Sequence, residues 1–276
     1  MTTLLQALTE GRQQLASESA ELEARVLLAH VLRVSKTDTY TWPEQELTAA
    51  QWTSYRALVD RRRLGEPIAY LVGEREFYGL PFAVDARVLI PRPETELLVD
   101  MALEMSSQTP LRVLDLGCGS GAIACAIAHN RPKWSVHGVD VSHEALAVAQ
   151  HNKQALKIGN LQLSQSDWFS SLEEIQFDLI VSNPPYVEPD SVWLQQGDVR
   201  FEPPLALTAK NAGMSDLEHI IACAGLFLST SGWLWLEHGF EQAGAVRECL
   251  QQSGFQQIQS RQDLQGYERV TGGRWG

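Results

Sequence analysis

The apolar positions in the first part of the chain repeat with the period of an α-helix. The clearest set stands at spacings i, i+3, i+4, i+7 and i+8, on Ala24, Leu27, Leu28, Val31 and Leu32. This spacing places one apolar stripe along a helix. A capping-box pattern over residues 48–51 predicts the start of a further helix. Such helices bury their apolar faces against each other, so the pattern predicts a small helical bundle up to about Gly65.

The pattern changes at the end of this bundle. The basic run at residues 61–63 is expected to form the solvated end of the last helix, where the helix dipole favours cations. Residues 68–90 then alternate between apolar and polar, with Gly73, Gly79 and Pro81 as interruptions. This second pattern predicts a β-hairpin.

Strand-sized apolar runs alternate with helix-sized spacers beyond Pro91. This alternation is typical of a mostly parallel sheet covered by helices on both faces. Strands are predicted at residues 112–116, 135–139, 161–164, 178–182, 232–237, 255–259 and 267–270. We therefore predict an α/β protein in three parts: an N-terminal helical domain (residues 1–66), a β-hairpin linker (67–90) and an α/β domain (91–276).

Charge and composition narrow the classes of partner. The chain of 276 residues carries 22 basic and 34 acidic residues, a net charge of −12, which is a poor match for binding a polyanion. Its four cysteines and seven histidines show neither a disulfide framework nor zinc-ligand spacing. There is no signal-peptide pattern and no apolar run near the roughly twenty residues that span a bilayer. These features predict a cytoplasmic protein with no metal site, no membrane segment and no nucleic acid as its principal partner.

A glycine-rich turn follows the first predicted strand of the α/β domain. Gly117, Gly119 and Gly121 stand at alternate positions before a helix start, and glycines let the backbone approach a ligand closely. Their spacing is not Gly-x-Gly-x-x-Gly, which disfavours a nicotinamide dinucleotide. Asp140 ends the next strand, where an acid can accept hydrogen bonds from ribose hydroxyls. A ribose without a pyrophosphate points to S-adenosylmethionine, although Asp140 alone could simply cap the following helix.

A second motif, Asn183-Pro184-Pro185-Tyr186, follows the apolar strand at residues 177–182. Asn183 and Pro184 each precede a proline and are therefore pushed out of the helical region. The turn presents two acceptors, the Asn183 side-chain oxygen and the Pro184 carbonyl, beside the ring of Tyr186. Two acceptors and an aromatic face suit a planar –NH2 group. A proline-rich turn that merely ends a strand explains the tetrapeptide equally well.

The order of these motifs resembles class I S-adenosylmethionine-dependent methyltransferases that act on an amino nitrogen. The resemblance is carried by residues 115–121, Asp140 and residues 183–186. Further segments narrow it to the HemK/PrmC family, the peptide chain release factor N5-glutamine methyltransferases: residues 67–73, 76–79 and 89–96. Taken alone, residues 91–96 also have a structural interpretation, as prolines that break a strand and acids that favour the first turn of a helix.

The resemblance implies a Rossmann-like class I methyltransferase domain, with a seven-stranded, mostly parallel sheet whose last strand is antiparallel. It implies S-adenosyl-L-methionine as cofactor and S-adenosyl-L-homocysteine as product. Class I peptide chain release factors would be the protein substrates, methylated on the glutamine of a Gly-Gly-Gln loop and recognised by the N-terminal helical domain. Residues 208–212 depart from the family, which more often has a glycine-rich stretch there, so the conformation of this loop stays open.

The resemblance also implies roles for individual residues. Catalytic and substrate-binding roles fall on Asn183, Pro184, Pro185 and Tyr186. Cofactor-binding roles fall on Gly117, Cys118, Gly119, Ser120, Gly121, Asp140, Asp167, Trp168 and Asn183. Asp167 and Trp168 follow the third strand, where adenine would bind. A capping Asp beside core aromatics explains these two nearly as well.

Two other functions fit part of the sequence. An amino-methyltransferase acting on adenine or guanine of DNA or RNA would use the same tetrapeptide, because a base also offers an –NH2 group. The acidic net charge and residues 91–96 weigh against it. A non-catalytic cofactor-binding scaffold would keep the glycine turn, but it has no reason to keep Asn183 and Tyr186 together.

Overall fold

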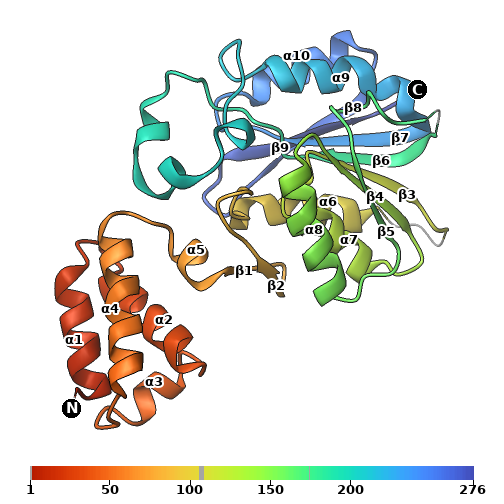
Figure 1. Cartoon of the computed structure of the whole chain (residues 1–276). Helices are drawn as coiled ribbons and strands as arrows, with labels where there is room; N and C mark the ends of the chain where they lie inside the picture. The colour runs from red at the N-terminus through yellow and green to blue at the C-terminus, as the bar shows by residue number, and fades with distance from the viewer. Residues whose placement is uncertain (1, 106–108, 174) are drawn as a thin grey trace. The chain divides into compact units, whose positions relative to one another are not determined.

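The computed structural model describes residues 2–105, 109–173 and 175–276. These residues form two compact units (Figure 1). One unit is built from the chain up to Glu74 together with Gln196–Phe201, and the other from Arg75–Gln195 together with Glu202–Gly276. No helix among the described residues is long and apolar enough to cross a bilayer.

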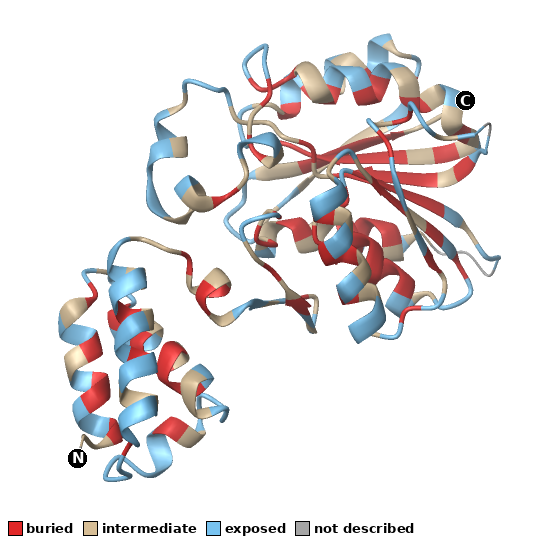
Figure 2. Cartoon of the chain, viewed as in Figure 1, coloured by how far each residue is buried: buried red, intermediate tan, exposed pale blue. Residues whose placement is uncertain are grey.

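The first unit is helical. Its helices are α1 (Leu4–Gln14), α2 (Ala20–Leu32), α3 (Asp38–Thr41), α4 (Ala49–Arg63) and α5 (Ile68–Val72). The predicted stripe on α2 is buried at Leu27 and Leu28, which pack with Tyr55 of α4 in one apolar core. Figure 2 shows this burial on the helix faces that meet, with the opposite faces exposed. The predicted capping box is present, because the Thr48 hydroxyl accepts a hydrogen bond from the Gln51 N–H.

The basic end of α4 differs in part from the prediction. Arg61 and Arg63 are exposed, as expected, but the Arg62 side chain is only 15% exposed. Its guanidinium binds Glu23 of α2 at 2.7 Å and Asp198 at 2.7 Å. Arg62 therefore holds the segment Gln196–Phe201 within this unit, a role that a local helix-end pattern could not indicate.

The predicted hairpin is shorter than the apolar alternation suggested. Strands β1 (Glu74–Phe77) and β2 (Leu80–Ala83) form it. Tyr78 and Gly79 make its turn with φ angles of 53° and 74°, as in hairpin turns that need two left-handed residues. Residues 68–72, predicted as the start of the hairpin, instead form helix α5, which is ended by Gly73 at a φ of 76°. Short apolar runs do not distinguish a buried strand from one helical turn.

The second unit contains the predicted sheet. Its strands are β3 (Arg112–Leu116), β4 (Ser135–Asp140), β5 (Leu161–Gln165), β6 (Phe177–Ser182), β7 (Leu228–Glu237), β8 (Gln256–Gln262) and β9 (Glu268–Arg274). Within the described residues, the sheet has seven strands in the order β5-β4-β3-β6-β7-β9-β8. Strands β3 to β7 pair in parallel, and β9 is antiparallel to β7 and β8. The predicted fold class is confirmed.

Helices cover both faces of this sheet. Figure 1 shows α6 (Glu96–Glu104), α7 (Ala122–Asn130) and α8 (His143–Ala155) on one face, with α9 (Ser215–Phe227) and α10 (Ala243–Gln252) on the other. Neighbouring residues of β3 point to opposite faces, so Val113 joins one apolar core and Leu114 the other. Short 3-10 turns lie between the larger elements: η1 (Pro93–Thr95), η2 (Val192–Gln195), η3 (Gly197–Phe201) and η4 (Pro204–Ala206).

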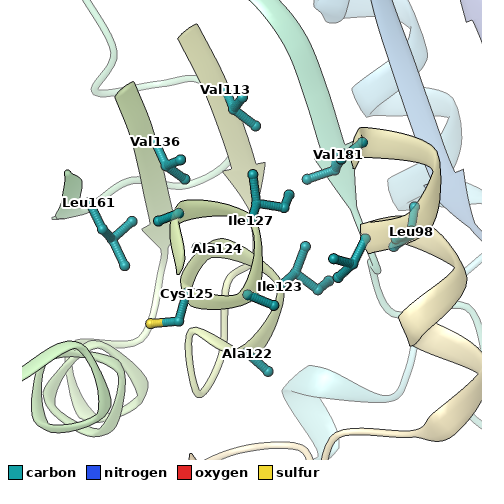
Figure 3. Packing of buried hydrophobic residues seen from close by; sticks show 14 of the residues in the cluster. Leu98, Val113, Ala122, Ile123, Ala124, Cys125, Ile127, Val136, Leu161 and Val181 are labelled. Carbon is teal, nitrogen blue, oxygen red and sulfur yellow. The ribbon is translucent and has the colours of Figure 1, made fainter. Parts of the chain in front are cut away.

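Helix α7 packs tightly against the sheet because alanine recurs along it. Residues from Ala122 to Ala128 are all buried. Figure 3 shows Ile123 and Ile127 of this helix among side chains of the strands, including Val113 and Val136. The helix that follows the glycine turn is therefore a fixed part of the core.

Asn152 of α8 ties this core to the hairpin. Its Oδ1 accepts a hydrogen bond from the Ala83 N–H at 2.8 Å, and its Nδ2 donates to the Ala83 carbonyl at 3.0 Å and to the Ser120 carbonyl at 2.9 Å. The side chain is 1% exposed. The Asn152 amide thus bonds to both the N–H and the carbonyl of Ala83 in β2, as a neighbouring strand would, and it also holds the glycine turn through Ser120.

Asn152→Ala is expected to lower the free energy of unfolding by about 3 kcal/mol, because it leaves these backbone groups without a partner. Gln154→Ala, at an exposed position of the same helix, is the matched control and should change stability by less than about 0.5 kcal/mol. Urea denaturation of both variants measures the difference. Equal stability of the two would show that the Asn152 clamp contributes nothing.

Candidate functional site

The site lies where the order of the strands reverses. Strand β3 pairs with β4 on one side and with β6 on the other. At their carboxyl ends, Leu116 is the register partner of Ser182, whose hydroxyl donates to the Leu116 carbonyl at 2.7 Å. The glycine turn follows Leu116 and the tetrapeptide follows Ser182. Pairing of the two strands therefore brings both motifs to the crevice where open α/β sheets bind ligands.

The glycine turn has left-handed backbone at each of its glycines. The φ angles are 68° at Gly117, 53° at Gly119 and 78° at Gly121. A Cβ on Gly121 would stand 3.1 Å from the Ala149 side chain, whereas a Cβ on Gly119 would meet nothing within 4 Å. A side chain at position 121 would therefore be tight against Ala149 and strained by the left-handed backbone, whereas Gly119 leaves the backbone open to the cavity beside it.

Asp140 holds this turn. Its Oδ2 accepts a hydrogen bond from the Gly119 N–H and its Oδ1 from the Ser142 N–H, each at 2.8 Å. Ser142, not Asp140, caps α8. Burial raises the pKa of Asp140, and these backbone hydrogen bonds oppose the rise. Each carboxylate oxygen keeps a lone pair for a ligand hydroxyl.

A cavity of about 360 Å³ opens beside these residues. Predicted site residues that line it are Gly117, Gly119, Asp140, Asp167, Trp168, Asn183 and Pro185. The other predicted residues, Cys118, Ser120, Gly121, Pro184 and Tyr186, are not among its lining residues. Cys118 and Ser120 are buried, and burial raises the pKa of the Cys118 thiol.

Several lining residues were not singled out from the sequence. Val141 is 44% exposed directly after Asp140, and an exposed valine after a strand-end acid is a signal that could have found it. Leu205 and Asp216 also line the cavity. They come from η4 and from the first turn of α9, and no local motif marks them.

Trp168 has a strained backbone at the cavity. Its φ is 49°, a conformation that a bulky residue adopts only when the surrounding structure imposes it. The Ser166 hydroxyl donates to the Trp168 carbonyl at 2.7 Å. A Cβ on Gly117 would lie 3.5 Å from the Trp168 ring, which is ordinary van der Waals contact. The ring therefore lies beside the glycine turn, and it is the left-handed backbone at Gly117, with a φ of 68°, that disfavours a side chain there.

Residues 89–96, one of the segments that carry the family resemblance, fix one wall of the site. Arg92 forms an ion pair with Glu202, a buried acid whose Oε2 also accepts from the Ile90 N–H at 3.2 Å. This links the motif to the segment that carries Pro203 and Leu205 into the cavity.

Asn183 is oriented by a residue of the same motif. Its Nδ2 donates to the Thr95 hydroxyl at 3.2 Å. Because the amide is planar, this bond turns the Oδ1 atom away from Thr95. Asn183 therefore offers an acceptor at the cavity it lines.

Tyr186 is anchored at both ends. Its hydroxyl donates to Oε1 of Glu237 at 3.3 Å, and its carbonyl accepts from Gln242 at 3.2 Å. Burial raises the pKa of Glu237 to about 7, and hydrogen bonds from the Thr95 and Tyr186 side chains oppose this rise. His238, the residue after Glu237, is also buried, and its ring nitrogens form hydrogen bonds with the Thr271 hydroxyl and the Gly239 carbonyl.

No group of acids, histidines and cysteines in the described part of the chain is arranged to hold a metal.

A seven-stranded sheet of this order, with a glycine turn and an acid beside the cavity, defines the class of a Rossmann-like methyltransferase. Residues 6–73 match the model of the PrmC N-terminal domain, and residues 93–197 match the methyltransferase small domain. The chain belongs to the release factor glutamine methyltransferase family, because relatives of that name are 46% and 47% identical to it over nearly its whole length.

The sequence is similar to curated relatives over nearly its whole length. The chain is 46% identical to a release factor glutamine methyltransferase of Shewanella oneidensis over 274 residues, which is 99% of this chain and 96% of the relative. It is 47% identical to the Escherichia coli K12 protein of the same name over 269 residues, 97% of each chain.

Solved structures agree on the fold. A methyltransferase from Pyrococcus furiosus superposes with a TM-score of 0.55 at 16% identity, over 81% of this chain and 99% of that chain. The T. thermophilus 16S rRNA N2 G1207 methyltransferase, in complex with AdoMet and guanosine, gives 0.52 at 21% identity, over 74% of this chain and 50% of its own.

The loop that departs from the family pattern packs behind the tetrapeptide. Asn211, Ala212 and Gly213 all have positive φ, of 57°, 53° and 79°. The Gln242 side chain donates to the carbonyls of Tyr186 and Ala212. A Cβ on Gly213 would stand 2.0 Å from the Tyr186 carbonyl oxygen. Asn211 and Ala212, at the end of residues 208–212, thus adopt the left-handed backbone typical of glycine, and Gly213 follows them.

Gly213→Ala is expected to lower the free energy of unfolding by about 2 to 4 kcal/mol, because the new methyl group displaces the backbone at Tyr186. Gly244→Ala is the matched control. It lies exposed in α10, where a Cβ meets nothing within 4 Å, and should be neutral or stabilising by up to about 1 kcal/mol. If urea denaturation gave the same result for both variants, the close approach at Gly213 would be refuted.

Proposed function

We propose that this protein transfers a methyl group from S-adenosyl-L-methionine to the side-chain amide nitrogen of the glutamine in the Gly-Gly-Gln loop of class I peptide chain release factors. Membership of the release factor glutamine methyltransferase family supports this proposal. The observation that carries the chemistry is the Asn183 amide, held by Thr95 with its oxygen free to accept at the cavity. S-adenosyl-L-homocysteine would be the second product.

The residues around the cavity suit this cofactor. Gly119 presents bare backbone, and the remaining lone pairs of Asp140 can accept from ribose hydroxyls. Asp167 can accept from the exocyclic amine of adenine, and Trp168 can contact its ring. Cys118, Ser120 and Gly121 would act by shaping the turn. When bound, S-adenosyl-L-methionine supplies an electrophilic methyl group on a sulfonium.

The amide nitrogen of glutamine needs help to react. Its lone pair is delocalised into the carbonyl, as in a peptide bond. In the proposed complex, the Asn183 oxygen and the Pro184 carbonyl accept its N–H bonds, fix its orientation and stabilise the positive charge that develops on it. Pro185 fixes the backbone of this turn, and Tyr186 supplies the neighbouring aromatic face. The methylated amide cation is strongly acidic, so it can release its proton to water without a dedicated base.

The N-terminal helical domain, residues 1–66, is the proposed recognition domain for the release factor, and residues 67–90 are the proposed linker. Release factors act on the ribosome, so the proposed place of action is the cytoplasm. No direct contact with nucleic acid and no membrane is part of this function, in keeping with the net charge of −12.

The first test offers the enzyme several substrates with radiolabelled S-adenosyl-L-methionine: a class I release factor, the same factor with its Gly-Gly-Gln glutamine replaced by alanine, and total RNA and DNA. Label is expected in the intact release factor alone. Equal labelling of the two factors would refute the assigned glutamine. Labelling of nucleic acid in place of the factor would support an amino-methyltransferase acting on bases.

Asn183→Ala is expected to lower kcat by at least about 100-fold, because one of the two acceptors for the amide is lost. The dissociation constant for S-adenosyl-L-methionine, measured by calorimetry, should change by less than about fivefold, since Asp140 and the glycine turn are untouched. A near-normal kcat in this variant would contradict the acceptor mechanism.

A further inference from the structure

A buried carboxylate lies beside the tetrapeptide without a role in the chemistry described so far. Glu237 ends β7, the strand next to β6, and its neighbour Leu236 is the register partner of Ser182. Glu237 is therefore level with Asn183. It is 2% exposed, and its Oε2 atom has no hydrogen-bond partner in the described part of the chain. Burying an acid with an unpaired oxygen is costly, which calls for a function.

The hydrogen bonds between Glu237 and Asn183 have a direction. A threonine hydroxyl has one proton to donate. At Thr95 the hydroxyl accepts from the Asn183 –NH2 group, so its own proton is left for a second acceptor. Glu237 is the carboxylate within its influence, because the Thr95 side chain acts to lower the pKa of Glu237. An ionised carboxylate can only accept. The order of donors is therefore Asn183 to Thr95 to Glu237, set by the charge at the end of the chain.

This order decides which atom Asn183 presents. With its nitrogen bound to Thr95, the amide offers Oδ1 on its other branch. If the Asn183 amide were reversed, it would present its –NH2 group to the –NH2 group of the substrate glutamine. Both groups are donors, so no hydrogen bond would form between them. Glu237 also accepts from the Tyr186 hydroxyl, so one carboxylate holds two residues of the tetrapeptide.

We propose that Glu237 is a positioning residue for the methyl transfer: through Thr95 it fixes the Asn183 amide with Oδ1 toward the substrate, and through the Tyr186 hydroxyl it fixes the aromatic ring. This inference rests on the proposed function, in which Oδ1 accepts from the glutamine amide. Glu237 does not touch the reacting atoms.

The charge on Glu237 makes its role depend on pH. Burial raises its pKa to about 7, while Thr95, Tyr186 and Arg269 of β9 oppose the rise and Glu94 of η1 adds to it. Arg269 is itself paired with Asp263. The adjacent His238 has a pKa lowered by burial and stays neutral near pH 7. Above pH 7 the ionised carboxylate enforces the order of donors. Below pH 7 the protonated carboxyl can donate to Thr95, and the order is lost.

The test measures kcat between pH 5.5 and 9 for the wild type and for Glu237→Gln, Thr95→Val and Thr95→Ser. The wild-type kcat should fall on the acid side with a midpoint near pH 7. Glu237→Gln and Thr95→Val should lower kcat by about 100-fold at pH 8 and lose this midpoint, with cofactor affinity within about threefold. Thr95→Ser keeps the hydroxyl and should keep both kcat and the midpoint. A Glu237→Gln enzyme with the wild-type profile would overturn the proposal.

A second measurement needs no turnover. In protein labelled with ¹⁵N at asparagine side chains, the –NH2 resonance of Asn183 is identified by its loss in Asn183→Asp. It should shift with a midpoint near pH 7 in the wild type and stay constant in Glu237→Gln. An Asn183 resonance that changes neither with pH nor on Glu237→Gln substitution would overturn the positioning role. Failure of the wild type to methylate a release factor, with this titration intact, would instead refute the proposed substrate.

Discussion

The pairing of β3 with β6 is the constraint on which the site depends. Chain order reverses between these strands, so no helix crossover fills the space beyond their carboxyl ends. The register of Leu116 with Ser182 sets the glycine turn level with the tetrapeptide to within one residue. A slip of one residue would turn the side chains of β6 to the opposite face of the sheet. The apolar cores on both faces exclude that slip, because Ile180 and Val181 are buried in different cores.

Several residues near the carboxyl ends of these strands are in energetically unfavourable states, and the packed core behind the site keeps them there. Burial raises the pKa of Asp115, at the end of β3, to about 8, and Glu237 is buried at the end of β7. Trp168 is held at a positive φ. Each of these costs stability in isolation. The tight packing of α7 and the Asn152 clamp hold the surrounding backbone, so that acids and acceptors keep their places without solvent to orient them.

The sequence predicts the parts of this protein that depend on local pattern. The sheet strands, the capping box at Thr48 and the family follow from periodicity and short motifs, and the structure and relatives confirm them. The link from Asn183 to Thr95 joins residues 88 apart, and the link from Tyr186 to Glu237 joins residues 51 apart. No pattern indicates such contacts, because they arise from strand order. The ion pairs of Arg62 escaped prediction for the same reason, and helix α5 because one helical turn has no readable period.

In the proposed complex, Asn183 and Pro184 both accept hydrogen bonds from the amide of a glutamine. A crystal structure with S-adenosyl-L-homocysteine and a release factor containing the Gly-Gly-Gln loop tests it directly. This binding mode requires the glutamine amide nitrogen within about 3 Å of both Asn183 Oδ1 and the Pro184 carbonyl oxygen, with Asn183 Nδ2 still hydrogen-bonded to Thr95. A glutamine bound elsewhere, or an Asn183 amide whose oxygen faces Thr95, would contradict it.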